Sequence, residues 1–265
     1  TLFQRVGLDS TRAPETWTDL RTAAARIQKL RGGVHGYGLP ADSEGMFEQF
    51  VPFAWSNGGE ILSVGADSSR FDSPENREAL EFLLGLRASS LLGSEAALDS
   101  EFVAGRLGMR MAGCALSARI SRAAPGPRFG VGLVPRPETD AGTHASLVEG
   151  DVLVSFTSSR RKEDALRLAR FLAAPAQQLA LYRALPDRMP ASLAADSAAG
   201  LRDRPAERVL FRQLETARAA PNSRNWYSQE LILASCVNEA LRGTRTVAWW
   251  VATADTGIAN NLRVR

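Results

Sequence analysis

Glu149-Gly-Asp-Val-Leu-Val-Ser-Phe156 is the stretch that decides the fold. It is a short apolar run that opens on an acidic glycine turn and is followed by Thr157-Ser158-Ser159 and a predicted helix. We interpret residues 147–156 as a strand that crosses from one lobe of the protein to another. The turn at its head would then face a cleft between the lobes, and such clefts are where binding sites tend to lie.

Before this stretch, helix and strand patterns alternate along the chain. Apolar residues at helical spacing predict a helix over 14–31, and the aromatic-rich segment 46–57 predicts another, ended by Gly58-Gly59. Ser73-Pro74-Glu75 is a strong helix start, since serine caps, proline fits the first turn and glutamate suits the helix dipole. A further helix is predicted over 95–105, and strands are predicted over 34–39, 107–112 and 129–135. This alternation favours an α/β fold.

After the crossing strand the chain reads as helical. An apolar face follows Ser158 and predicts a long helix that Pro175 interrupts. Further helices are predicted over 176–183, 205–218, 227–242 and 246–262. Trp249 and Trp250 lie in the last of these, where helical spacing places at least one of them in the core.

The composition excludes several classes of protein. The 265 residues are 45% hydrophobic and 23% charged, which is ordinary for a globular protein. No apolar run is long enough to span a membrane, and the first residues lack a signal-peptide pattern, so we expect a processed or truncated start. The net charge of +3 is spread along the chain, which argues against nucleic-acid binding.

The residues that bind metals and cofactors are few. Cys114 and Cys236 have no CxxC spacing or neighbouring histidine, so no metal site is expected. The two cysteines form either one long-range disulfide or two buried thiols. The GxG within 129–135 is not a dinucleotide fingerprint, because prolines follow it instead of a helix. No cofactor is expected.

Motifs spread along the whole chain resemble the extracellular solute-binding proteins of ABC importers, specifically the sugar-binding family that includes the maltose-binding protein. They are Leu2-Phe3, Gly7-Leu8, Pro14-Glu-Thr-Trp17-Thr-Asp-Leu20, Tyr37-Gly38, Trp55 with Gly58-Gly59, Asp72-Ser73-Pro74-Glu75 with Ala79, Phe102 with Gly105 and Met109, Gly150-Asp151, Glu163 with Ala165 and Phe171, Pro190, and Leu241 with Gly243. The resemblance implies a two-lobed α/β fold of the type II periplasmic-binding-protein kind, with three crossings between the lobes. Lobe closure around a ligand presents such a protein to a membrane permease.

The resemblance also implies how the lobes divide the sequence. Family members carry a further stretch ahead of the part that matches Thr1, so the first strands of the N-terminal lobe would be missing here. Residues 1–155 and 220–265 would form the C-terminal lobe, and residues 156–219 the returning part of the N-terminal lobe. The class implies a monomeric protein without catalytic activity, either periplasmic or held outside the cell membrane as a lipoprotein.

A sugar cleft needs carboxylates, amides or arginine beside aromatic rings, because sugars present hydroxyls and flat C–H faces. On positions that match the family, the candidate ligand-binding residues are Met46, Phe47, Glu48, Gly113, Glu149, Asp151, Arg224, Trp226 and Tyr227. Trp226 is the leading candidate, since it follows a polar linker and opens a helix. For Trp226 and Tyr227 the alternative is packing between the lobes, and for Glu149 and Asp151 it is a solvated turn.

Other ligands and one other class of function stay open from the sequence. Maltose-binding members carry a tryptophan shortly after the glycine at Gly113, whereas Cys114-Ala-Leu116 follows here, which argues against maltodextrin. Arg188 and Arg224 would favour an anionic ligand such as a glycerophosphodiester, and Glu48 and Asp151 a polyamine or a hydroxylated ligand; a peptide is a further alternative. A glycoside hydrolase using Glu149 and Asp151 is the competing class.

Overall fold

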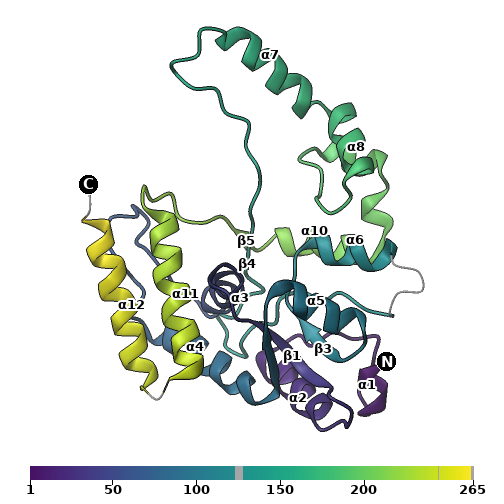
Figure 1. The fold of residues 1–265 in the computed structure, drawn as a ribbon, viewed down its shortest axis with the longest axis vertical. Helices are drawn as coiled ribbons and strands as arrows, with labels where there is room; N and C mark the ends of the chain where they lie inside the picture. Colours follow the sequence, from purple (N-terminus) through teal and green to yellow (C-terminus); the bar gives the residue numbers. More distant parts are fainter. Residues whose placement is uncertain (123–127, 244, 264–265) are drawn as a thin grey trace. The chain divides into compact units, whose positions relative to one another are not determined.

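The computed structural model describes residues 1–122, 128–243 and 245–263, and they form two compact units. Unit 1 consists of Thr1–Met111, Pro127–Val148 and Gln213–Arg265, and unit 2 of Ala112–Gly126 and Glu149–Arg212. Figure 1 follows the chain through both units by colour. Each unit is described by itself below.

A three-stranded parallel sheet lies at the centre of unit 1. Strand β1 (His35–Pro40) pairs with β2 (Ser90–Gly93) on one side and β3 (Leu107–Arg110) on the other. The predicted strands over 34–39 and 107–112 are therefore confirmed. The sequence reading missed β2, because four residues are too short to show the alternation of a strand.

Most helices of unit 1 begin just after a residue whose side chain caps them. They are α1 (Leu2–Arg5), α2 (Trp17–Gln28), α3 (Ser43–Ser56), α4 (Pro74–Leu86), α5 (Glu95–Val103), α11 (Trp226–Arg242) and α12 (Val247–Leu262), with a short 3-10 turn at Arg87–Ser89. Thr16, Asp42 and Ser73 each accept a hydrogen bond from a backbone N–H in the first turn of α2, α3 and α4. The predicted helix start at Ser73 is confirmed.

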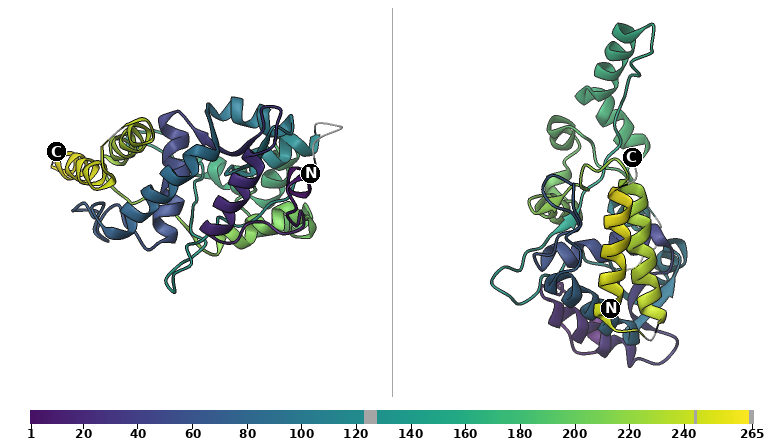
Figure 2. Two further views of the ribbon diagram at one scale, coloured as in Figure 1. Left: turned by 90° about the horizontal axis from the view of Figure 1, so that it is seen from below. Right: turned by 90° about the vertical axis from the view of Figure 1, so that its left-hand side faces the viewer.

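Helix α3 is the centre of the core of unit 1. Its side chains are buried around most of its circumference, including Met46, Phe50, Phe53 and Trp55, as expected of a helix that is apolar on nearly every face. Helix α11 packs against it, and α12 lies beside α11, as Figure 2 shows. Trp250 is 7% exposed and belongs to this core, whereas Trp249 is 44% exposed.

The predicted crossing strand over 147–156 is wrong in its extent. Only Ser146–Leu147 forms a strand, β4, which pairs in parallel with β5 (Ala217–Arg218). Residues 149–156 have no secondary structure and are exposed. After β4, Val148 N still donates a hydrogen bond to Arg218 O (3.0 Å). Among the described residues, no strand lies beside 149–156 to pair with their backbone N–H and C=O groups.

The predicted strand over 129–135 is also wrong. This segment has no strand, and only an isolated bridge joins Arg136 to Thr16. Backbone and side chain of Trp17 hold it instead, since Trp17 N donates to Arg136 O (2.9 Å) and its Nε1 to Pro135 O (3.1 Å). Two closely spaced prolines remove the N–H donors that a strand would need.

Unit 2 is helical and has a small core. Its helices are α6 (Cys114–Arg122), α7 (Lys162–Ala173), α8 (Pro175–Ala184), α9 (Leu193–Ala198), a 3-10 turn (Leu201–Asp203) and most of α10 (Pro205–Leu214). The buried apolar side chains are Leu116, Ile120, Tyr182, Ala195 and Leu201. Within the unit, α7 contacts α8 (Figure 1).

Large apolar side chains of unit 2 are exposed in unusual number. They come from the segment before α7, from α7 itself and from α8 to α9, and they are Val152, Leu153, Val154, Phe156, Leu166, Leu168, Phe171, Leu172, Leu181, Leu185 and Leu193. Val152 and Phe156 are 80% and 76% exposed, and Leu153, which points to the opposite side in an extended chain, is 58% exposed. A soluble domain rarely leaves contiguous apolar surface uncovered.

The changes of unit along the chain can be set beside the predicted lobe boundaries, which stay a prediction. Residues 112–126, expected in the same lobe as the preceding sheet, group with unit 2, and the other changes of unit fall at 148/149 and 212/213. Cys114 and Cys236 are both free thiols, and burial raises the pKa of each.

Candidate ligand-binding site

The carboxyl ends of three parallel strands meet at one edge of the sheet in unit 1. Asp42, just past β1, caps α3 by accepting from Gly45 N (2.8 Å), and Ala41 N donates to Gly93 O (2.9 Å) beyond the last pair of β1 and β2. A Cβ on Gly45 would lie 2.9 Å from Glu95 Oε1, so the first turn of α3 lies directly against the Glu95 carboxylate. In open α/β sheets, ligands bind outside this edge.

Arg110 ties the ends of β2 and β3 together. Its side chain is 2% exposed and forms ion pairs with Glu95 and Asp99, and its Nη1 donates to Glu95 O (3.1 Å). The Glu95 side chain is 46% exposed, so its carboxylate is oriented by a buried guanidinium and still accessible. An oriented, accessible carboxylate is an acceptor suited to ligand hydroxyl or ammonium groups.

Tyr37 and Gln49 form a buried polar pair below this edge. Gln49 Nε2 donates to Tyr37 Oη (2.8 Å), and burial raises the pKa of Tyr37, so the phenol stays protonated. Both side chains are nearly inaccessible, which makes them part of the support of α3 on β1.

Trp226 lies at the first position of α11, against the start of α3. Its ring contacts that of Phe47 edge to face, with centroids 5.6 Å apart and an interplanar angle of 75°. Phe47 is 1% exposed, whereas Trp226 is half-buried and packs on the core with part of its ring. A half-buried indole braced by a fixed ring suits stacking against the C–H face of a sugar.

The structure separates the six predicted site residues of unit 1 into supporting and accessible groups. Met46 is 0% exposed and Phe47 1% exposed, so their side chains support the site from within the core. Glu48, Arg224 and Tyr227 are exposed, and Trp226 is intermediate. Phe47 and Trp226 are the two that the structure brings into direct contact.

The other three predicted residues belong to unit 2. Gly113 is exposed and lies two residues after the last residue of unit 1 in this part of the chain. Glu149 and Asp151 are exposed in the segment without secondary structure, and Asp151 forms an ion pair with Arg188 whose side chains are 84% and 67% exposed. An ion pair this exposed contributes little to stability.

Glu95, Asp99 and Arg110 are edge residues that the sequence reading did not single out. Arg110 ends β3, and Glu95 and Asp99 lie one turn apart in α5, which begins just after β2, so the unrecognised strand β2 concealed the position of Glu95. If β2 is recognised as a strand, Ser94 is predicted to cap the helix that follows it, α5. Glu95 is then predicted at the carboxyl edge of the sheet, the edge where Asp42 lies.

Two further observations bound the chemistry of the described residues. No group of three or more His, Cys, Asp or Glu side chains among them is placed to hold a metal ion, and no helix among them is long and apolar enough to cross a membrane. A shallow hollow of about 240 Å³ over Trp17 and Phe82 contains none of the predicted site residues.

The carboxyl edge of the parallel sheet in unit 1 thus carries the oriented Glu95 carboxylate, and Trp226 is braced against Phe47 at the start of α3. The chain belongs to the bacterial extracellular solute-binding protein family, whose family model matches residues 2–206. This is a family of binding proteins and not of enzymes, so the glycoside hydrolase alternative is set aside. The predicted two-lobed periplasmic-binding-protein fold is confirmed by the similarity to solved structures.

Similar proteins extend beyond the part that this chain covers. A binding protein of Brucella abortus is 29% identical over 178 residues, which are 64% of this chain and 42% of that protein, so the chain spans less than half of this relative. The structure of the cyclic α-maltosyl-1,6-maltose binding protein from Arthrobacter globiformis is 25% identical, with a TM-score of 0.79 over 99% of this chain and 68% of that one. An ABC transporter solute-binding protein from Thermotoga lettingae, bound with α-D-tagatose, is 23% identical, with a TM-score of 0.84 over 98% and 68% of the two chains.

Proposed function

We propose that this chain is part of the substrate-binding component of an ABC importer, and that its ligand is a sugar or a polyol. The observation that carries the proposal is the contact of Trp226 with Phe47, near the start of α3, where Glu48 is exposed and the accessible Glu95 carboxylate lies against the first turn. Aromatic stacking and charged hydrogen-bond acceptors are the two kinds of contact that a sugar requires.

The other predicted site residues offer the same two kinds of contact, aromatic rings and polar groups. Tyr227 and Arg224 add an exposed ring and an exposed donor beside Trp226. Gly113, Glu149 and Asp151 of unit 2 are proposed to contribute further contacts to the ligand. The protein then acts outside the cell membrane, in the periplasm or anchored by a lipid, and delivers the ligand to the membrane subunits of a permease.

Titration calorimetry tests the ligand assignment. We propose to titrate the native protein, purified from its host, with a panel of mono- and disaccharides. We expect a dissociation constant in the micromolar range for at least one of them. Trp226→Ala is expected to weaken that binding about 5- to 100-fold, since loss of a stacking aromatic removes roughly 1–3 kcal/mol.

Trp249→Ala is the matched control, because Trp249 is a partly exposed tryptophan of the same unit in α12 and is not proposed to touch ligand. It should leave the affinity unchanged. Equal affinities of the wild-type protein and Trp226→Ala would return Trp226 to a packing role. Binding of a glycerophosphodiester or a polyamine in place of any sugar would keep the class and change the ligand.

We further propose that unit 2 is the returning part of a second lobe whose other strands come from polypeptide outside these 265 residues. The support is that Val152, Leu153, Val154 and Phe156 expose apolar side chains on both sides of an extended segment. A continuous apolar run of this kind is typical of a parallel strand buried on both faces. The apolar face of α7, including Leu168 and Phe171, would then cover one face of the completed sheet.

Dye binding and hydrogen exchange test this lobe assignment. We expect the 265-residue chain alone to bind the apolar dye ANS strongly and to exchange the amides of 149–156 within seconds, since no described ladder protects them. The protein as its host produces it should bind little ANS and protect these amides. Weak ANS binding by the 265-residue chain would contradict the assignment.

A further inference from the structure

Two short strands of unit 1 carry the chain to and from unit 2. The chain leaves unit 1 after Val148 and re-enters it at Gln213, and the strands at these two points, β4 and β5, pair with each other in parallel. Because the chain also passes into unit 2 after Met111, the backbone next to this pair is one of the places where a change in the arrangement of the two units is accommodated.

The segments that lead into the two strands are cross-linked by side chains. Gln213 Oε1 accepts from Val134 N (2.8 Å), and Gln213 Nε2 donates to His144 O. Thr216 Oγ1 donates to the same His144 oxygen (2.6 Å). The chain before β4 and the chain before β5 are thus held to each other independently of the strand pairing.

Arg218, in β5, attaches the strand pair to the body of unit 1. Its Nη2 lies 2.9 Å and 2.7 Å from the two carboxylate oxygens of Glu60, and its guanidinium lies 4.6 Å from the centre of the Trp55 ring. Trp55 is 3% exposed and fixed in the core. The backbone of Glu60 is fixed as well, because the fully buried Asn76 donates to Glu60 O (2.8 Å).

We propose that Arg218 is a positioning residue for ligand binding, which acts through Glu60 and Trp55. By holding β5 to two rigid parts of unit 1, it limits the range of arrangements that the two units adopt before ligand binds. Where the restricted range contains the arrangement that binds ligand, less conformational entropy is lost on binding, so the contact is proposed to raise affinity without Arg218 touching the ligand. The affinity part of this inference rests on the proposed function, whereas the restriction of motion does not.

The distance distribution between two spin labels tests the restriction directly, in the protein as its host produces it and without ligand. Labels are placed at Thr253→Cys in α12 and Ala180→Cys in α8, both exposed positions, with Cys114 and Cys236 replaced by serine. Glu60→Gln, Arg218→Gln and the double variant are each expected to broaden the distribution. The double variant should broaden it no more than either single one, because the two residues act as a pair.

Glu101→Gln is the matched control. Glu101 forms a comparable two-point ion pair with Arg106 in unit 1, at 2.7 Å and 2.6 Å, and lies in neither crossing strand. It should leave the distribution unchanged. Arg218→Lys keeps the charge but loses the planar two-point contact and the stacking, so it should restore the narrow distribution only in part.

Affinity is the second readout, for whichever ligand of the panel binds. Glu60→Gln and Arg218→Gln should raise Kd about fivefold, a typical coupling between distant sites, and Glu101→Gln should not. Unchanged distributions in both Glu60→Gln and Arg218→Gln would overturn the inference, whatever happens to Kd. Broadened distributions with no ligand in the panel bound would uphold the restriction and count against the proposed sugar function alone.

Discussion

Arg110→Met is expected to lower the free energy of unfolding of unit 1 by about 3–5 kcal/mol, which is the usual cost of removing one partner from a buried ion pair. The Arg110 side chain is 2% exposed and that of Asp99 11% exposed. Methionine fills a similar volume but leaves Asp99 without its guanidinium in a poorly hydrated site. The midpoint and slope of urea unfolding, followed by tryptophan fluorescence, measure the loss.

Arg106→Met is the control for this change. Arg106 pairs with Glu101 as closely, but its side chain is 50% exposed, so the expected loss is below about 1 kcal/mol. Equal losses in the two variants would show that burial of the Arg110 network has no energetic weight. Arg110→Met should also lower ligand affinity, because it frees the Glu95 carboxylate at the sheet edge.

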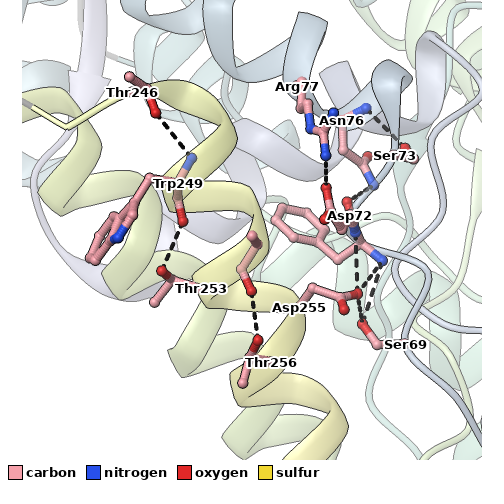
Figure 3. Close-up of polar contacts among 12 residues, drawn as sticks. Ser69, Asp72, Ser73, Asn76, Arg77, Thr246, Trp249, Thr253, Asp255 and Thr256 are labelled. Carbon is pink, nitrogen blue, oxygen red and sulfur yellow. Dashed lines mark hydrogen bonds and ion pairs between the residues drawn. The ribbon is translucent and has the colours of Figure 1, made fainter.

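Asp255→Ala is expected to destabilise unit 1 by about 2–4 kcal/mol, since hydrogen bonds to a charged acceptor are the strong ones. One oxygen of Asp255, Oδ1, accepts from Ser69 Oγ (2.6 Å), Phe71 N (3.1 Å) and Asp72 N (3.2 Å). Figure 3 shows these bonds running from α12 to the turn that precedes α4. Hydrogen exchange should show faster exchange of the Phe71 and Asp72 amides in the variant.

Thr256→Ala is the matched control, one residue further along α12. Thr256 Oγ1 donates only to Ala252 O within its own helix (2.8 Å), and its loss should cost less than about 0.5 kcal/mol. Asp255→Asn should fall between the two, because an amide oxygen still accepts but carries no charge. Unaltered stability and exchange in Asp255→Ala would mean that α12 is held to α4 by apolar packing alone.

The sequence alone determined the elements whose signals are local. Ser73 marked a helix start that the structure confirms, because a cap needs only the three residues that follow it. The family motifs, spread over most of the chain, were enough to indicate the family and the α/β fold class. Trp226 was placed at a helix start, next to a polar linker, before any contact of its ring was known.

Only the tertiary structure decided the elements that depend on distant partners. β2 is a strand because β1 pairs with it. The run 149–156 has a more strand-like sequence but forms no strand, since no described strand lies beside it. Arg110 and Glu95 are fifteen positions apart and meet only because β2 and β3 flank β1. The backbone hydrogen bonds of a strand are formed with the neighbouring strand. The residue pattern within one segment therefore cannot show whether that neighbour is present.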